Sequence, residues 1–119
     1  MEFDWQKYHS LALSWKSSSD EELKRCAISR SYYAFWHKLR KFKGIPGKRG
    51  QPHKIVRDKL ENNYSDEQEI DLSYLLKGLQ DLREDADYVT ELHNVNSTLG
   101  DFFTRLQTAE NLYTTITTP

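Results

Sequence analysis

The stretch Glu22–Phe42 constrains the fold more than any other part of the chain. Placed on a helical wheel at about 100° per residue, it is apolar on nearly all sides. One face carries Leu23, Ala27, Arg30, Ala34 and His37, and the opposite face carries Ile28, Tyr32, Phe35, Leu39 and Phe42. A helix of this kind is normally the central, buried element of its domain. We therefore expect the remaining segments to pack around it.

Arg30 and His37 are unusual because both lie on the small-residue face of this helix, two turns apart. Burying a charged group costs free energy unless the group is paired or lines a cavity. Two interpretations follow. Arg30 can form a structural ion pair with Asp87 or Asp85 of a later helix. Alternatively, Arg30 and His37 can belong to a functional site, where perturbed charges are common.

Four further segments show the apolar spacing of helices. They are Asp4–Trp15, His53–Asn63, a segment from a cap at Ser65 to about Tyr88, and a segment from Ser97 or Thr98 to about Ile116. Ser19 or Asp20 is expected to cap the central helix, which ends before Gly44 and Pro46. No segment alternates like a strand. The prediction is an all-α antiparallel bundle of four to five helices, forming one domain over residues 1–119.

Composition excludes several classes of protein. The chain of 119 residues has no run of 18 apolar residues, so we expect no membrane association. The single Cys26 cannot form an internal disulfide, and the acidic start does not resemble a signal peptide, so we expect a cytoplasmic protein. Four scattered histidines give no zinc-ligand spacing, and no glycine-rich phosphate loop is present. We therefore expect neither a metal ion nor a cofactor.

The net charge of −1 hides a strong asymmetry. Residues 38–57 contain eight lysines and arginines without a carboxylate, whereas residues 58–91 are rich in aspartate and glutamate. A basic block of this kind suits a polyanion such as RNA. The other interpretation is a solvated loop whose charges the acidic segment balances. The residues predicted to contact the RNA backbone are Lys41, Lys43, Lys48 and Arg49, with His53 at the following helix start.

Two motifs resemble those of a known family. The sequence AISRSYYAFWHKL resembles AxSRxYYAxFH, the signature of small bacterial and archaeal HEPN domains (higher eukaryote and prokaryote nucleotide-binding). The later sequence LREDADY, Leu82–Tyr88, resembles the LRxxADY motif of the same proteins. The resemblance covers essentially the whole chain. It implies a HEPN-like bundle that forms a homodimer, in which two copies of the site line one cleft.

The resemblance also suggests a chemistry. Catalytic HEPN proteins cleave RNA without a metal ion by an Arg-x(4–6)-His pair, and Arg30 and His37 match this spacing. Histidine can move a proton at the 2′-hydroxyl near neutral pH, and arginine presents a fixed charge to phosphate.

However, active family members usually carry the pair on a later helix as RNxxxH. This chain has Arg83 there, with Asp87 in place of the histidine and Tyr88 after it. Either the Arg30–His37 pair serves, or Arg83 works with a histidine from elsewhere, or the site is degenerate. The leading assignment gives the chemistry to Arg30 and His37, with Arg83 and Tyr88 assisting.

Trp36 is predicted to be exposed beside Tyr32, as part of a dimer surface. The leading hypothesis for function is an RNA-binding, metal-independent endoribonuclease that acts as a toxin or in phage defence, for example on tRNA. The resemblance implies a nucleotidyltransferase antitoxin as partner. One alternative is an inactive HEPN module that binds nucleotide, RNA or a nucleotidyltransferase. Another is a dimerising helical adaptor.

Overall fold

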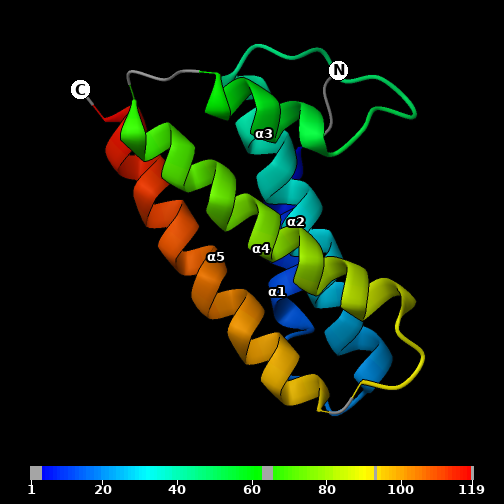
Figure 1. The fold of residues 1–119 in the computed structure, drawn as a ribbon. Helices are drawn as coiled ribbons and strands as arrows, with labels where there is room; N and C mark the ends of the chain where they lie inside the picture. Colours follow the sequence, from blue (N-terminus) through cyan, green and yellow to red (C-terminus); the bar gives the residue numbers. More distant parts are fainter. Residues whose placement is uncertain (1–3, 63–65, 93, 119) are drawn as a thin grey trace.

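The computed structural model describes residues 4–62, 66–92 and 94–118, and these residues form five α-helices without a strand (Figure 1). The helices are α1 (Trp5–Ser14), α2 (Glu21–Phe42), α3 (Lys54–Glu61), α4 (Glu67–Tyr88) and α5 (Val95–Thr117). Figure 1 shows α4 and α5 side by side and antiparallel. The predicted all-α bundle is confirmed.

Four of the helices begin at a side chain that accepts hydrogen bonds from the first backbone amides, as helix caps do. The caps are Asp4, Asp20, Asp66 and Asn94. Asp20, rather than Ser19, therefore caps α2. The predicted caps Ser97 and Thr98 are wrong, because Asn94 Oδ1 accepts from the backbone amides of Asn96 and Ser97, and α5 therefore starts earlier. The predicted cap Ser65 and the helix end Asn63 lie outside the described residues.

The core is built around α2, as the sequence predicts. The apolar side of α2 packs into one cluster with the buried faces of α4 and α5. Its largest fully buried side chains include Ile28, Tyr32, Leu39, Leu72, Leu76, Leu79 and Phe102. Each buried leucine or phenylalanine contributes about 1.5–3 kcal/mol relative to an exposed one. In the described part of the chain, no helix is both long enough and apolar enough to cross a membrane.

Arg25 connects α2 to the end of α4. Its guanidinium donates hydrogen bonds to the carbonyl oxygens of Ala86 (3.1 Å), Val89 (2.6 Å) and Thr90 (3.3 Å). The last carbonyls of a helix lack intrahelical partners and carry partial negative charge, so a cation there is stabilising. Nearby, the Ser29 hydroxyl donates to Asp87 at 3.2 Å. These contacts fix the C-terminal turns of α4 against α2.

The predicted ion pair between Arg30 and Asp87 is wrong. The Arg30 guanidinium lies over the rings of Tyr8 (5.9 Å) and Trp15 (5.1 Å), on the side of α2 that faces α1. Asp87 instead accepts a hydrogen bond from Arg83 at 3.3 Å. Arg30 avoids the cost of burying an unpaired charge because aromatic faces attract the cation and it stays partly exposed.

The predicted exposure of Trp36 is also wrong. Trp36 is only 5% exposed, and its indole Nε1 donates to the carbonyl oxygen of His53 at 3.0 Å. The reason is that the segment after α2 folds back along this helix. Arg40 holds that segment by donating from Nη1 to the Ile45 carbonyl at 2.7 Å. Trp36 is thus a core residue that ties the start of α3 to α2.

Candidate functional site

His37 packs beneath α1. Its ring stacks on Trp5 with centroids 3.7 Å apart, and its Nδ1 accepts a hydrogen bond from Arg40 Nε at 3.0 Å. Burial, and then the charge of Arg40, lower the pKa of His37 from 6.5 to about 4. The imidazole is therefore neutral near pH 7, and the nitrogen that could take a proton is already engaged.

Arg30 and His37 are consequently both covered by α1, each against different aromatic rings. Arg30 contacts Tyr8 and Trp15, and His37 contacts Trp5. Both side chains therefore contribute to the packing of α1 against α2. The predicted pairing of these two residues at a reaction site would require α1 to move.

A second arginine forms a different arrangement at the end of α4. The Arg83 guanidinium carbon lies 5.3 Å from the ring centroid of Tyr32, 5.4 Å from that of Tyr33 and 5.9 Å from that of Tyr88. Arg83 also donates from Nη1 to Asp87. Both family-like motifs therefore meet here, because the tyrosines Tyr32 and Tyr33 belong to the first and Arg83, Asp87 and Tyr88 to the second.

His53 joins this arrangement from the residue before α3. Its Nδ1 lies 3.3 Å from the Tyr32 hydroxyl, and its ring centroid is 5.5 Å from that of Tyr33. The backbone of His53 is fixed by the hydrogen bond from Trp36. We call these six residues the Arg83–His53 cluster: Tyr32, Tyr33, His53, Arg83, Asp87 and Tyr88. His53 and Arg83 come from different segments, and both lie against Tyr32 and Tyr33.

The protonation states of the cluster follow from burial and neighbouring charge. Burial, and then Arg83, lower the pKa of His53 from 6.5, so its imidazole is neutral near pH 7. Burial raises the pKa of Tyr32 and of Tyr33, so both hydroxyls keep their protons. Burial alone would lower the pKa of Arg83, but Tyr33 and the hydrogen bond to Asp87 raise it overall. The guanidinium is thus permanently charged.

This set of groups suits a phosphate ester. A neutral imidazole can accept a proton, tyrosine hydroxyls can donate hydrogen bonds, and a guanidinium can bind phosphate oxygens. Arg83 is only 3% exposed, and its Nε is buried without a hydrogen-bond partner. Tyr88 is 75% exposed, so it is the member of the cluster most open to solvent.

The predicted RNA-binding residues do not form one surface. Lys43 pairs with Glu69 of α4. Lys48 and Arg49 are exposed and, with Lys43, line a cavity of about 450 Å³ under the segment that follows α2. Lys41 lines a different cavity, and His53 belongs to the Arg83–His53 cluster. The basic block therefore divides between two different cavities.

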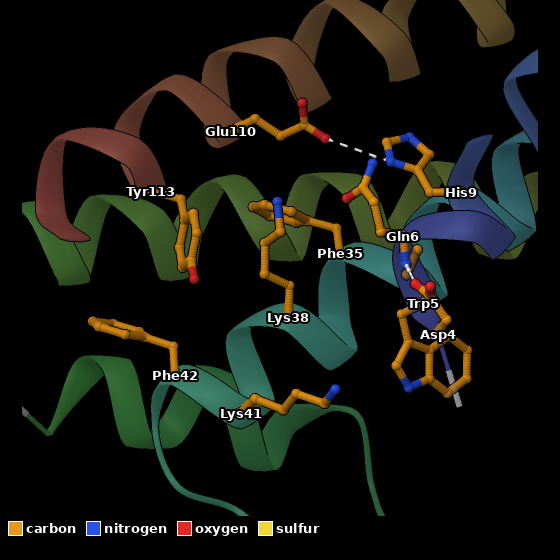
Figure 2. A pocket seen from close by; sticks show the side chains of 11 residues that line it. Asp4, Trp5, Gln6, His9, Phe35, Lys38, Lys41, Phe42, Glu110 and Tyr113 are labelled. Carbon is orange, nitrogen blue, oxygen red and sulfur yellow. Dashed lines mark hydrogen bonds and ion pairs between the residues drawn. The ribbon is translucent and has the colours of Figure 1, made fainter. Parts of the chain in front are cut away.

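The larger of these cavities, about 650 Å³, lies between α1, α2 and α5 (Figure 2). We call it the α1–α2–α5 cavity. His9 Nδ1 lies 3.9 Å from Glu110 Oε1 at its edge, and Lys38 Nζ lies 5.2 Å from the ring centroid of Tyr113. Its lining residues are Asp4, Trp5, Gln6, His9, Ala34, Phe35, Lys38, Lys41, Phe42, Glu110 and Tyr113.

Sequence reasoning did not find this cavity. The spacing of Trp5 and His9, or of Glu110 and Tyr113, indicates a shared helix face. No pattern indicates that the faces of α1 and α5 meet across α2.

Across residues 4–62, 66–92 and 94–118, no group of three or more histidine, cysteine, aspartate and glutamate side chains is arranged to hold a metal ion. The described residues thus form an all-α bundle of five helices, in which arginine, tyrosine and histidine side chains gather where the two motifs meet. Comparison with protein-family models, curated proteins and solved structures finds no match to the chain.

Proposed function

We propose that this protein binds RNA and cleaves it without a metal ion, at the Arg83–His53 cluster. One observation carries the proposal: Arg83 lies within 5.4 Å of the Tyr33 ring, which in turn lies 5.5 Å from the ring of His53. In this proposal His53 takes, from a different segment, the role of the histidine that the second motif lacks. A HEPN-like toxin or phage-defence nuclease, acting with a nucleotidyltransferase antitoxin and as a homodimer, is the role that the sequence resemblance implies.

The proposed reaction is an internal transfer of the phosphate. The ribose 2′-oxygen attacks the adjacent phosphorus while neutral His53 takes the 2′-hydroxyl proton. The bond from phosphorus to the 5′-oxygen breaks, and a proton from water or from the imidazolium neutralises that oxygen. The products are a 2′,3′-cyclic phosphate and a 5′-hydroxyl. Arg83 stabilises the charge that develops on the phosphate oxygens, and the Tyr33 hydroxyl donates to them.

The remaining bases would hold the RNA backbone. Lys48 and Arg49 are exposed and face solvent near the start of α3, which carries His53 at its N-terminal side. Phosphate contacts of this kind add affinity without reading sequence. Substituting either residue by alanine should weaken RNA binding and reduce the slope of log affinity against log salt by about one.

A second candidate function is an RNA- or nucleotide-binding module without catalysis. Two observations favour it: Arg83 is nearly fully buried, and Asp87 already occupies one of its donors. Substrate would have to displace Asp87 or Tyr88 to reach the guanidinium. In this case the cluster would serve to fix α4 against α2 and α3.

The test is cleavage of total RNA and tRNA in EDTA by wild type, His53→Gln and Arg83→Lys. His37→Gln and Arg30→Lys test the other arginine–histidine pair, and Lys77→Ala, on the exposed side of α4, is the control. Each variant is first compared with wild type in thermal unfolding and in oligomeric state. Because Arg83→Lys can destabilise the fold, Tyr33→Phe is included as a mild change in the same cluster.

We expect His53→Gln and Arg83→Lys to lower the cleavage rate at least a hundredfold while His37→Gln and Lys77→Ala keep it. Mass spectrometry should find 2′,3′-cyclic phosphate ends. Loss of cleavage in the folded His37→Gln variant alone would move the site to α2. Absence of cleavage by wild type, with RNA binding retained, would favour the second candidate.

A further inference from the structure

We propose that the α1–α2–α5 cavity binds a planar aromatic ring carrying a phosphate, the chemistry of a single unpaired nucleotide. This site is separate from the Arg83–His53 cluster, and the proposal holds whether or not that cluster is catalytic. The nucleotide can be free, or it can be one unit of a bound RNA strand.

The size of the cavity fits a ligand of this kind. Its volume of about 650 Å³ lies within the range of about 300–1,000 Å³ typical of small-molecule sites. Residues of three helices line it, and a volume of this size admits a single nucleotide and not a base-paired helix. Figure 2 shows Tyr113 and Phe42 on one side, Trp5 on the other, and Lys38 between them.

The walls are aromatic. Trp5, Phe42 and Tyr113 are each partly exposed and line the cavity, with the buried Phe35 beside them. Phe42 and Tyr113 contact each other edge to face, with centroids 5.7 Å apart, so the two rings brace one wall. Unpaired bases bind proteins largely by stacking on such side chains, because every base has an aromatic face.

The charges around the cavity leave a cation for the phosphate. Asp4 is occupied as the cap of α1, where its carboxylate accepts from two backbone amides at 3.1 Å. Glu110 lies 3.9 Å from His9, and burial lowers the pKa of His9, so the imidazole is neutral and Glu110 keeps its own charge at the edge of the cavity. Among the described residues, no carboxylate forms an ion pair with Lys38, whose ammonium lies against the Tyr113 ring. Lys38 is therefore the residue placed to meet an anion, and Glu110 can accept from the amino group of a base.

The cavity also lies close to the Arg83–His53 cluster. Trp5 stacks on His37, whose ring centroid is 4.9 Å from Trp36, and the Trp36 ring is 5.7 Å from that of His53. One row of ring contacts thus leads from the wall of the cavity to the cluster.

The experiment is titration of the full chain with UMP and AMP, followed by calorimetry and by tryptophan fluorescence, to which Trp5 contributes. Uridine and inorganic phosphate separate the contribution of the ring from that of the anion. A short oligouridine labelled with a fluorophore tests the RNA-borne form by anisotropy. The variants are Lys38→Gln and Tyr113→Leu, with Lys77→Gln as the matched surface control. All are checked for folding, and Tyr113→Phe replaces Tyr113→Leu as the milder change if the latter unfolds.

We expect saturable binding of a mononucleotide or of the oligonucleotide, weakened at least tenfold by Lys38→Gln and unchanged by Lys77→Gln. Tyr113→Leu should weaken uridine as well, whereas Lys38→Gln should not. Binding of the oligonucleotide alone would identify the RNA-borne form, and binding of the mononucleotide alone would identify the free form.

Absence of saturable binding by either, or equal affinity of wild type and the folded Lys38→Gln, would overturn the proposal. Cleavage is read separately. Loss of RNA cleavage by His53→Gln with nucleotide binding intact identifies a defect in the Arg83–His53 cluster. Loss of nucleotide binding by Lys38→Gln with RNA cleavage intact identifies a defect in the α1–α2–α5 cavity.

Discussion

The contact of Arg25 with the end of α4 gives the sharpest test of how this fold is held together. Arg25→Ala removes three hydrogen bonds to the carbonyls of Ala86, Val89 and Thr90. A hydrogen bond with a charged partner contributes about 1.5–3 kcal/mol. Only Ala86 is buried, at 2% exposed, whereas water can replace the guanidinium at the other two carbonyls. We therefore expect Arg25→Ala to cost about 2–3 kcal/mol of unfolding free energy.

Arg30→Ala is the matched comparison, because the sequence suggests that Arg30 connects α2 to α4. In the structure Arg30 has two cation–π contacts at 5.1 and 5.9 Å, and these are worth about 1 kcal/mol at partly exposed sites. Urea unfolding at pH 7, followed by circular dichroism, measures both, with Lys77→Ala as a surface control expected within about 0.5 kcal/mol of wild type. Arg25→Lys should fall between wild type and Arg25→Ala, because lysine keeps the charge and loses the fork. A larger loss of unfolding free energy for Arg30→Ala than for Arg25→Ala would refute the conclusion that Arg25, rather than Arg30, connects α2 to α4.

Three further outcomes follow from the packing and the buried histidine. Trp36→Phe should lower the free energy of unfolding by about 1–2 kcal/mol, because the His53 carbonyl loses its indole donor. Light scattering should find the same oligomeric state as for wild type, and a changed state would show that Trp36 lies at an interface between copies of the chain. Gly47→Ala should cost about 1 kcal/mol in thermal unfolding, because the new Cβ would lie 3.3 Å from Cζ of the anchored Arg40; an unchanged or higher Tm would show that Arg40 moves aside freely. On folding, the pKa of His37 falls from 6.5 to about 4. Between these two pH values the unfolded chain binds more protons than the folded chain. The free energy of unfolding therefore declines as the pH falls from 6.5 toward 4. His37→Gln should flatten this decline in urea midpoints measured across the window, and an identical slope in both proteins would contradict the shift.

Much of the helical architecture could be predicted from local pattern. The apolar spacing of Glu22–Phe42 is set by the sequence alone, and α2 is the central helix. Short polar side chains predict where the helices start. In the structure, however, Asp66 and Asn94 cap α4 and α5, whereas the sequence pattern predicts nearby serines and a threonine. Several residues can cap equally well in isolation, and the packed positions of the helices decide among them.

The candidate site was predicted only in part. The second motif placed Arg83, Asp87 and Tyr88 near the end of one helix, and Arg83 and Asp87 lie near each other there because they are four residues apart. The sequence could not show that His53 joins them, because the segment after α2 has no periodic pattern and its path depends on Arg40 and Trp36. It also gave Trp36 the wrong environment, because a wheel shows the sides of a helix and not which side another segment covers.

The sequence alone determined that this chain is an all-α protein, that α2 is its centre, and that residues 38–57 form a basic block without a carboxylate. These are properties of local spacing and composition. Tertiary structure decided that Arg25, rather than Arg30, holds the end of α4, that Arg83 and His53 both pack against Tyr33, and that residues of α1, α2 and α5 line one cavity beside Lys38. Those outcomes depend on the rotation of each helix about its own axis and on the path of one irregular segment, which only the packing of the whole chain fixes.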